Sequence, residues 1–415
     1  MPINGADTGW VLVCAALVLF MTPGLALFYG GTVRSGNVLV MLQQNIVPLG
    51  IVSLTWVIIG YSLAFGTPAD DRGLFGGIQQ FLLGNLDTAP TPARHVVDQG
   101  AAIPTLAFVA YQMMFAVITP ALITGATADR LKLAGWAIFL TAWSILVYPV
   151  VAHWLFNPAG WLATMGAQDW AGGIVVHACA GAAALAVMAV VGRRTGWPEA
   201  DATKHSIPLV IIGAGILWFG WFGFNAGDGL AVNDVTAQAL LNTHIAAAAG
   251  MLAWLAIEWR REGHPTVLGA VTGAVAGLAT ITPCAGFVGT GPALLIGLLA
   301  GAVCPLAVKL KFRFRYDDAL DVIAVHFLGG ILGSLLLGVF GSSAVNSNGR
   351  DGLLYGGGVT LLTNQVIALA VVIAFSFVVT WVIATIIQRT VGLRSDPADE
   401  ARLDEVQQAA AAYVA

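Results

Sequence analysis

The sequence predicts an all-α polytopic membrane protein with eleven transmembrane helices. Hydrophobic residues make up 58% of the 415 residues and charged residues only 10%, whereas soluble globular chains carry about 25% charged residues. The mean hydropathy is +0.83, and the 50 glycines suit closely packed membrane helices. A net charge of −4 without a basic patch argues against nucleic-acid binding.

Eleven segments have the roughly 20 apolar residues that a transmembrane helix needs. They lie near 8–31, 38–66, 102–127, 134–156, 171–191, 206–224, 236–257, 266–285, 290–308, 319–341 and 361–387. Of the 18 Lys and Arg residues, 15 then fall on one side: Arg34, Arg130, Lys132, Arg193, Arg194, Lys204, Arg260, Arg261, Lys309, Lys311, Arg313, Arg315, Arg389, Arg394 and Arg402. The other side has Arg72, Arg94 and Arg350. The positive-inside rule therefore predicts an external N-terminus and a cytoplasmic C-terminus.

The segments outside the spans also carry signals. Residues 1–8 hold no cationic stretch, so the first span is predicted to be retained rather than cleaved as a signal peptide. The longest external loop, about 67–101, is rich in Pro and Asp and is predicted to form surface. Residues 1–394 form the predicted membrane domain, followed by a tail, 395–415, in which Ser395-Asp396-Pro397 indicates a helix start and a short helix through 399–413.

Two spans share a motif that indicates an internal repeat. The fifth and tenth spans both read Val-His-x-x-x-Gly, around His177 and His326, and the first and sixth share Phe-x-x-Gly at Phe28 and Phe224. The spacing predicts two inverted five-helix repeats, about 8–191 and 206–341, followed by the eleventh helix at 361–387. A histidine within the membrane is a candidate functional residue; the alternative is a neutral imidazole that only hydrogen-bonds a neighbouring helix.

Other polar residues have both structural and functional interpretations. Asp169 opens the fifth span and either caps it or orders a site. Asp317, Asp318 and Asp321 are predicted to form a cap and salt-bridge cluster beside Arg313 and Arg315. The aromatic run 218–224 is either an interfacial belt or, with Asp228 directly after it, part of a small cation site.

The enzyme and metalloprotein classes find no support. The four cysteines lie in apolar segments without CxxC spacing, so neither a disulfide framework nor a metal site is indicated. The sequence also offers no nucleophile or nucleotide-binding loop, and no cofactor is expected.

Specific motifs resemble those of the Amt/Mep/Rh ammonium transporter family, closest to its bacterial Amt branch. The resemblance runs from about residue 7 to residue 403. The motifs are Thr22-Pro23-Gly24-Leu25-Ala26-Leu27-Phe28-Tyr29-Gly30-Gly31, Asp169-Trp170-Ala171-Gly172-Gly173, Gly220-Trp221-Phe222-Gly223-Phe224-Asn225-Ala226-Gly227, Thr282-Pro283, and Asp317-Asp318 followed by His326.

The resemblance implies a homotrimer of eleven-helix subunits with a pore through each. His177 and His326 match the paired pore histidines, Phe115 and Phe224 the stacked phenylalanines at the outer mouth, and Trp221 a pore-lining tryptophan. Further matches to pore-region positions are Tyr111, Gln112, Tyr148, Asp169, Thr272 and Thr282. The outer site departs from the family pattern twice: Asp228 stands where a serine is usual, and Phe156 where a tryptophan is usual.

The expected function is ammonium transport across the bacterial plasma membrane by a multi-pass protein. Ammonium, or methylammonium as an analogue, would bind outside, lose a proton and cross as ammonia, with or without transfer of the proton. The alternative is an ammonium sensor that conducts little. The family's tail docks a cytoplasmic PII protein; Gly392-Leu393-Arg394 and Leu403-Asp404 match, but Gln407-Gln408-Ala409 departs from the usual pattern, so this partner is in doubt.

Overall fold

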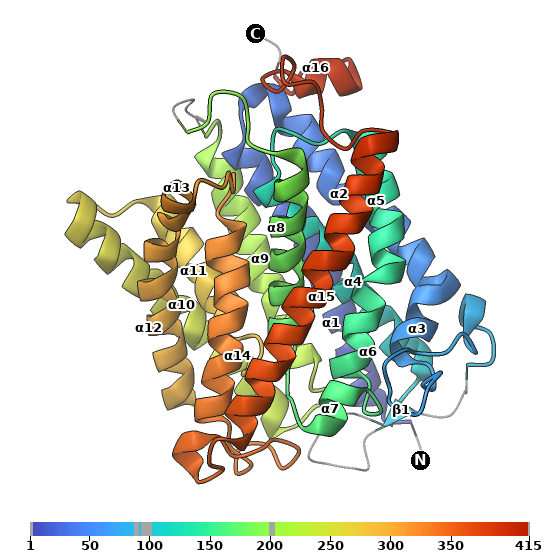
Figure 1. Cartoon of the computed structure of the whole chain (residues 1–415). Coiled ribbons are helices and arrows are strands. Elements are labelled where there is room, and N and C mark those ends of the chain that lie inside the picture. Colours follow the sequence, from blue (N-terminus) through green and yellow to red (C-terminus); the bar gives the residue numbers. More distant parts are fainter. Residues whose placement is uncertain (1–2, 87–90, 93–101, 199–203, 414–415) are drawn as a thin grey trace.

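Long apolar helices cross the whole molecule side by side. The computed structural model describes residues 3–86, 91–92, 102–198 and 204–413. Within these ranges, ten helical segments are long and apolar enough to cross a membrane. They are Gly5–Thr32, Ser35–Phe65, Thr105–Ala126, Leu133–Met165, Gly173–Val191, Ile207–Gly227, Asp234–Glu262, Thr290–Phe314, Ile323–Phe340 and Thr360–Thr390. The two chain termini lie at opposite ends of this bundle (Figure 1).

Five of these segments are broken into shorter helices, and five are continuous. The continuous ones are α1 (Gly5–Thr32), α4 (Thr105–Ala126), α9 (Ile207–Gly227), α10 (Asp234–Glu262) and α15 (Thr360–Thr390). The broken ones comprise η1 (Ser35–Asn37), α2 (Val38–Thr55), η2 (Trp56–Gly60) and α3 (Tyr61–Phe65); α5 (Leu133–Leu146), α6 (Tyr148–Phe156) and α7 (Trp161–Met165); η4 (Gly173–Ala178) and α8 (Cys179–Val191); α12 (Thr290–Ala307) and α13 (Leu310–Phe314); and η5 (Ile323–Phe327) and α14 (Leu328–Phe340).

The remaining predicted span is a shorter helix. The sequence predicts it at 266–285, and α11 covers Val267–Ile281, 15 residues, which is about 22 Å at 1.5 Å per residue. The helix ends because the chain turns at Thr282-Pro283, where Cys284 donates its N–H to the carbonyl of Ile281 at 2.8 Å. The all-helical class is confirmed, while α11 falls short of the usual length of a full span.

The connections contain little regular structure. Two short strands, β1 (Thr91–Pro92) and β2 (Ala102–Ile103), pair in antiparallel fashion within and beside the predicted loop 67–101. That loop also contains η3 (Phe81–Leu83), and η6 (Leu353–Tyr355) precedes α15. Arg94, counted in the sequence among the external cations, lies outside the described residues.

Helices α1 and α9, the first helix of each predicted repeat, pack closely through glycines. A Cβ on Gly213 would collide with the backbone of Phe28, and a Cβ on Gly220 would collide with the side chain of Met21. A Cβ on Gly24 would in turn lie 2.6 Å from Ile216. Small residues therefore let the two backbones approach, as is usual for helices packed in a membrane.

The short helix predicted in the C-terminal tail is present, but its predicted start is wrong. The helical element there, α16, covers Leu403–Gln408 and does not start at 395–399. The Asp396 carboxylate instead accepts a hydrogen bond from the N–H of Ala398 at 2.9 Å, which forms a local turn. The tail then docks: the Asp404 carboxylate accepts the N–H groups of Leu39 and Val40 at 3.0 and 2.9 Å, and so caps the start of α2.

The predicted salt-bridge cluster forms around Asp317 and Asp321, but its partners are not Arg313 and Arg315. Both of these arginines are exposed, whereas the buried Asp317 carboxylate lies 2.8 Å from Arg194 and 3.6 Å from Arg130. The partners come from the ends of α8 and α4, because the fold brings those ends beside the start of η5. The predicted cap is found at Asp318, which accepts the N–H groups of Val322 and Ile323 at 3.1 and 2.7 Å.

Candidate functional site

Two buried histidines face each other in the middle of the bundle. His177 lies in η4 and His326 in η5, and both turns have π-helical hydrogen bonding. Their Nδ1 atoms are 3.3 Å apart, and the ring planes make an angle of 22°. A neutral pair joined in this way has one Nδ1–H donor and one Nδ1 acceptor, so one free Nε2 is a donor and the other an acceptor.

The glycine of the Val-His-x-x-x-Gly motif explains how the two turns meet. A Cβ on Gly330 would lie 2.5 Å from the carbonyl oxygen of Gly173 and 2.8 Å from Cβ of His177. A Cβ on Gly181 would likewise collide with the ring of Phe327. Each repeat copy of the motif therefore supplies the close approach that brings the histidine of the other copy into contact.

An aspartate eight residues before each histidine fixes its turn. Asp169 accepts four backbone N–H groups at 2.7 to 3.0 Å, those of residues 172 to 175 at the start of η4. Asp318 stands in the same position before η5 and caps its start. The geometry of Asp169 is that of a structural cap, and it orders the site through His177 rather than by pointing into the passage.

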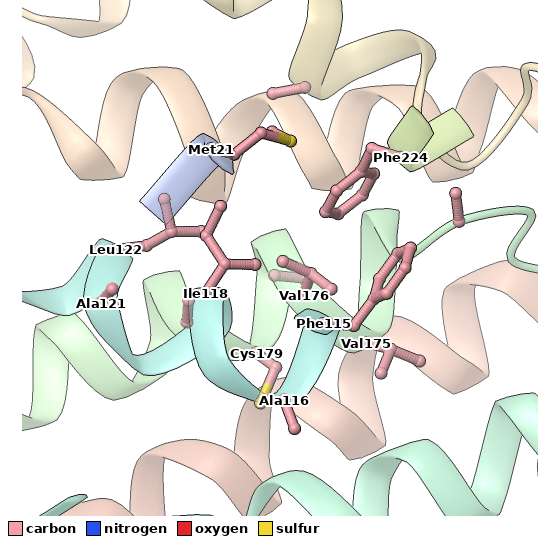
Figure 2. Packing of buried hydrophobic residues seen from close by; sticks show 14 of the residues in the cluster. Met21, Phe115, Ala116, Ile118, Ala121, Leu122, Val175, Val176, Cys179 and Phe224 are labelled. Atoms are coloured by element: carbon pink, nitrogen blue, oxygen red, sulfur yellow. The ribbon is translucent and has the colours of Figure 1, made fainter. Parts of the chain in front are cut away.

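Two phenylalanine rings lie against each other on the N-terminal side of the histidines. The rings of Phe115 on α4 and Phe224 on α9 lie 4.3 Å apart at 37°, and Figure 2 shows them facing each other beside Ile118 and Val176. Tyr111 fixes this arrangement because its hydroxyl donates to the backbone carbonyls of Gly223 and Phe224 at 3.0 and 2.9 Å.

The aromatic run 218–224 divides between two environments. The ring of Trp221 is stacked 5.6 Å from that of His177, and its Nε1 donates to Thr282 Oγ1 at 2.9 Å. Phe219 is 55% exposed on the outside of the bundle. The run therefore directs Trp221 toward the histidines and Phe219 toward the outside of the bundle.

A polar layer lies one helical turn beyond the phenylalanines. Gln112 Nε2 lies 3.5 Å from Asp228 Oδ1, and Asp228 is only 2% exposed. Tyr148 is buried against the rings of Trp56 and Trp143. Phe156 ends α6 and is 3% exposed. A carboxylate and an amide thus lie next to the aromatic pair.

An apolar cavity lies between the phenylalanine pair and the histidine pair. Its lining comprises Met21, Leu25, Ile118, Leu122, Val176, His177, Leu217, Trp221, Phe224 and His326. It leaves about 10 Å³ for the centre of a water-sized molecule, which is the space that one such molecule needs. Apart from the two histidines and Trp221 its lining residues are apolar, so the cavity suits a small uncharged molecule.

A second cavity continues from His326 toward the C-terminal side. It is lined by residues that include Tyr29, Thr32, Thr272, Asp321 and Lys204. The two cavities share His326 as a lining residue, so they lie next to each other at the histidine pair. Sequence reasoning missed the aliphatic lining because Leu, Ile, Val and Met occur on every face of these helices.

The ten membrane-length helices and the two cavities that meet at a buried histidine pair are features of a multi-pass membrane protein of the channel or transporter class. Residues 9–413 match the model of the Ammonium Transporter Family. The chain belongs to that family.

Curated relatives of this chain are found in bacteria. An ammonium transporter of Mycobacterium tuberculosis (strain ATCC 25618 / H37Rv) is 44% identical over 434 residues, covering 99% of this chain and 90% of the relative. An ammonium transporter of Bacillus subtilis (strain 168) is 42% identical over 395 residues, covering 95% of each chain. These identities support the resemblance to the bacterial Amt branch.

Solved structures share the fold over nearly the whole chain. Saccharomyces cerevisiae Mep2 superposes with a TM-score of 0.86 at 32% identity, covering 95% of this chain and 88% of that one. A structure described as a sensor Amt protein superposes with a TM-score of 0.85 at 29% identity, covering 98% of both chains. The fold is therefore common to Mep2 and to a protein described as a sensor.

Proposed function

We propose that this protein transports ammonium, taking the ion up on the N-terminal side and conducting it as ammonia past His177 and His326. The observation that carries the proposal is the apolar cavity for one water-sized molecule, closed by Phe115 and Phe224 and lined by the histidine pair. With 15 of 18 cations on the C-terminal side of the spans, the N-terminal side is external under this proposal.

Selectivity follows from the chemistry of the passenger. Potassium and ammonium have similar size and charge, so the passage cannot separate them by size. An apolar passage penalises either cation by several kcal/mol or more. Potassium cannot lose its charge, whereas ammonium can leave a proton on the outer side and enter as ammonia. Ammonia both donates and accepts hydrogen bonds, which matches the donor and the acceptor that a neutral histidine pair offers.

Recordings from purified protein in liposomes test this proposal. Ammonium pulses are expected to produce uptake, measured as a current or as a change in internal pH, and equal potassium pulses are expected to produce none. Equal responses to both ions would contradict it. A protein that binds ammonium without measurable uptake would instead be the sensor, which the structural likeness to a sensor Amt protein makes the second candidate.

Asp228 is proposed to strengthen ammonium binding at the outer site. Its carboxylate is 2% exposed and lies beside Gln112, one turn beyond Phe224. A carboxylate near a cation in a partly screened site contributes on the order of 1 kcal/mol or more. We therefore expect Asp228→Asn to raise the half-saturating ammonium concentration several-fold to tenfold, since about 1.4 kcal/mol is a factor of ten.

Transport titrations at matched protein levels measure this effect of Asp228→Asn. Rejection of potassium should survive, because the apolar passage imposes it. Asp234→Asn is the matched control, since Asp234 is an exposed carboxylate at the start of α10 on the same side. An unshifted titration for Asp228→Asn would assign the residue a local structural role.

The docked tail is proposed to support transport by holding the ends of several helices together. Besides capping α2 through Asp404, it places the Glu400 carboxylate 2.7 Å from the N–H of Thr195, and the Gln407 amide 3.0 Å from the carbonyl of Leu131. Truncation after Arg394 is expected to lower transport several-fold while membrane insertion persists, because the ten membrane-length helices remain. Uptake per inserted protein, normalised by surface or membrane-fraction blotting, measures this.

A finer variant separates the cap from the rest of the tail. Asp404→Ala removes two hydrogen bonds to the start of α2, a loss of about 1 kcal/mol for a helix cap. Glu405→Ala is the control, because the neighbouring Glu405 is exposed. Unchanged uptake in both the truncated chain and Asp404→Ala would make the tail dispensable.

A further inference from the structure

Loop 66–86, between α3 and β1, exposes four large apolar side chains. Phe75, Ile78, Phe81 and Leu82 are 54%, 64%, 50% and 59% exposed. We call these four residues the apolar loop face. Single exposed apolar residues are ordinary, but a contiguous group marks an interaction surface. The loop that the sequence presents as polar surface, because of its Pro and Asp, therefore has an apolar part.

The loop folds back along a membrane-length helix instead of extending away from it. Its short helix η3 packs against η2 and α3, and both belong to the span Ser35–Phe65. Gly60 and Trp56 in η2 precede the end of that span by five and nine residues, which is about 8 and 14 Å along a helix. In Figure 1 this blue segment lies beside α3 at the edge of the molecule. The apolar loop face thus lies level with residues inside a span.

Part of the loop's backbone is hydrogen-bonded within the protein. Ser62 Oγ on α3 donates to the carbonyl of Gly77 at 2.9 Å and accepts the N–H of Gln80 at 2.9 Å. Turns bond Leu83 N–H to the Gln80 carbonyl at 2.8 Å and Gly84 N–H to the Phe81 carbonyl at 3.0 Å. Irregular backbone at membrane depth needs such internal partners.

A close fit to α3 holds the loop in this position. A Cβ on Gly76 would collide with the backbone carbonyl of Leu63. The loop is also fixed to the next broken span, because Trp154 Nε1 donates to the carbonyl of Leu74 at 2.8 Å. These contacts orient the loop with its polar backbone inward and its large apolar side chains outward.

The outward side continues an exposed apolar surface of the same span. Leu54 and Ile58, on the same span as η2, are 65% and 41% exposed. The charged residues Asp70, Asp71 and Arg72 precede the apolar loop face, and the Asp70 carboxylate caps the local turn by accepting the N–H of Arg72 at 2.8 Å. The charges thus gather in one turn and the apolar side chains in another.

We propose that the apolar loop face inserts into the bilayer leaflet on the N-terminal side and contacts lipid acyl chains. The loop then lies in the leaflet beside the α2–α3 span, with its charged turn at the level of the lipid headgroups. Apolar residues on the outside of a membrane protein at this depth gain their stabilisation from lipid. This inference does not depend on the transport proposal, since it concerns the outer surface and not the passage.

Spin-label accessibility in lipid nanodiscs tests the insertion. Ile78→Cys and Phe81→Cys, each carrying a nitroxide label, are compared with Asp71→Cys in the charged turn, in the full-length chain. The four native cysteines are buried. The background signal from any labelling of them is measured on the native chain, which has no introduced cysteine. We expect oxygen, which dissolves in acyl chains, to relax the labels at 78 and 81, and a water-soluble nickel chelate to reach mainly the label at 71. The ratio of oxygen to nickel accessibility should be several-fold higher at 78 and 81.

Two outcomes would overturn the proposal. Equal nickel accessibility at all three positions would place the loop in water. Exclusion of both reagents at 78 and 81 would mean that protein, such as a second copy of the chain, covers the face. Leu82→Cys provides an independent position, and because all these side chains are exposed, folding is expected to tolerate each substitution.

Discussion

Replacement of His177 or His326 with alanine is expected to abolish selective ammonium transport, with uptake reduced at least tenfold or potassium admitted. Each imidazole supplies a polar group in an otherwise apolar cavity, and the two hold each other through the Nδ1–Nδ1 contact of 3.3 Å. Removing one leaves the buried nitrogen of the other without its partner, at a cost of about 1–3 kcal/mol. It also enlarges the cavity, so water can enter.

Liposome uptake of ammonium and potassium by the two variants measures this effect. His244→Ala is the matched control, since His244 lies on α10 against the rings of Trp218 and Phe222 and away from the passage. The control is expected to keep both rate and selectivity. If the two passage variants also transported ammonium selectively at the normal rate, the histidine pair would be reduced to packing residues.

The pairing of the histidines shows what the sequence can reveal about such a site. A repeated Val-His-x-x-x-Gly motif in two apolar spans predicts that both histidines lie at equivalent positions, and the structure brings them into contact. The motif also contains the residues that allow this contact, because Gly181 and Gly330 let the two turns cross closely. Residue spacing alone could also indicate Asp169 as a cap, since it precedes the turn whose N–H groups it accepts.

Contacts between residues far apart in the sequence could not be predicted, because they depend on how the helices pack. Asp317 is adjacent in sequence to Arg313 and Arg315, and local spacing therefore predicts those partners. The observed partners, Arg130 and Arg194, are 187 and 123 residues away, and only the packing of helix ends brings them together. The same holds for the position of the tail helix. Its residue Asp404 accepts a hydrogen bond from the start of α2, 365 residues away, and local sequence does not reveal that contact.

Substitution of Asp317 with asparagine is expected to destabilise the protein by several kcal/mol. Its carboxylate is fully buried between Arg194, at 2.8 Å, and Arg130, at 3.6 Å. Burial alone would raise the pKa of Asp317, but the hydrogen bonds and charges of Arg194 and Arg130 outweigh it and hold that pKa below its usual range. Burial lowers the pKa of Arg130 to about 10, so this guanidinium stays charged at neutral pH.

Removing the carboxylate thus leaves two cations with reduced compensation. Breaking a buried pair by removing one partner typically costs about 3–5 kcal/mol. We expect the apparent melting temperature of Asp317→Asn in detergent to fall by several degrees in fluorimetric scans at a fixed rate. Glu262→Gln is the control, because Glu262 and Lys309 form a half-exposed pair at 3.9 Å, and exposed pairs contribute only about 0–1 kcal/mol.

The pH dependence gives this prediction a second, independent measurement. A carboxyl whose pKa is lowered by folding stabilises the native state above its unfolded pKa of about 3.9, and this contribution is lost as pH falls through the lowered value. The melting temperatures of the native chain and Asp317→Asn should therefore differ by a constant amount between pH 8 and pH 5. They should converge only below about pH 4. A difference that disappeared near pH 6, or one no larger than that of Glu262→Gln, would show that the buried ion pairs of Asp317 do not hold these helix ends together.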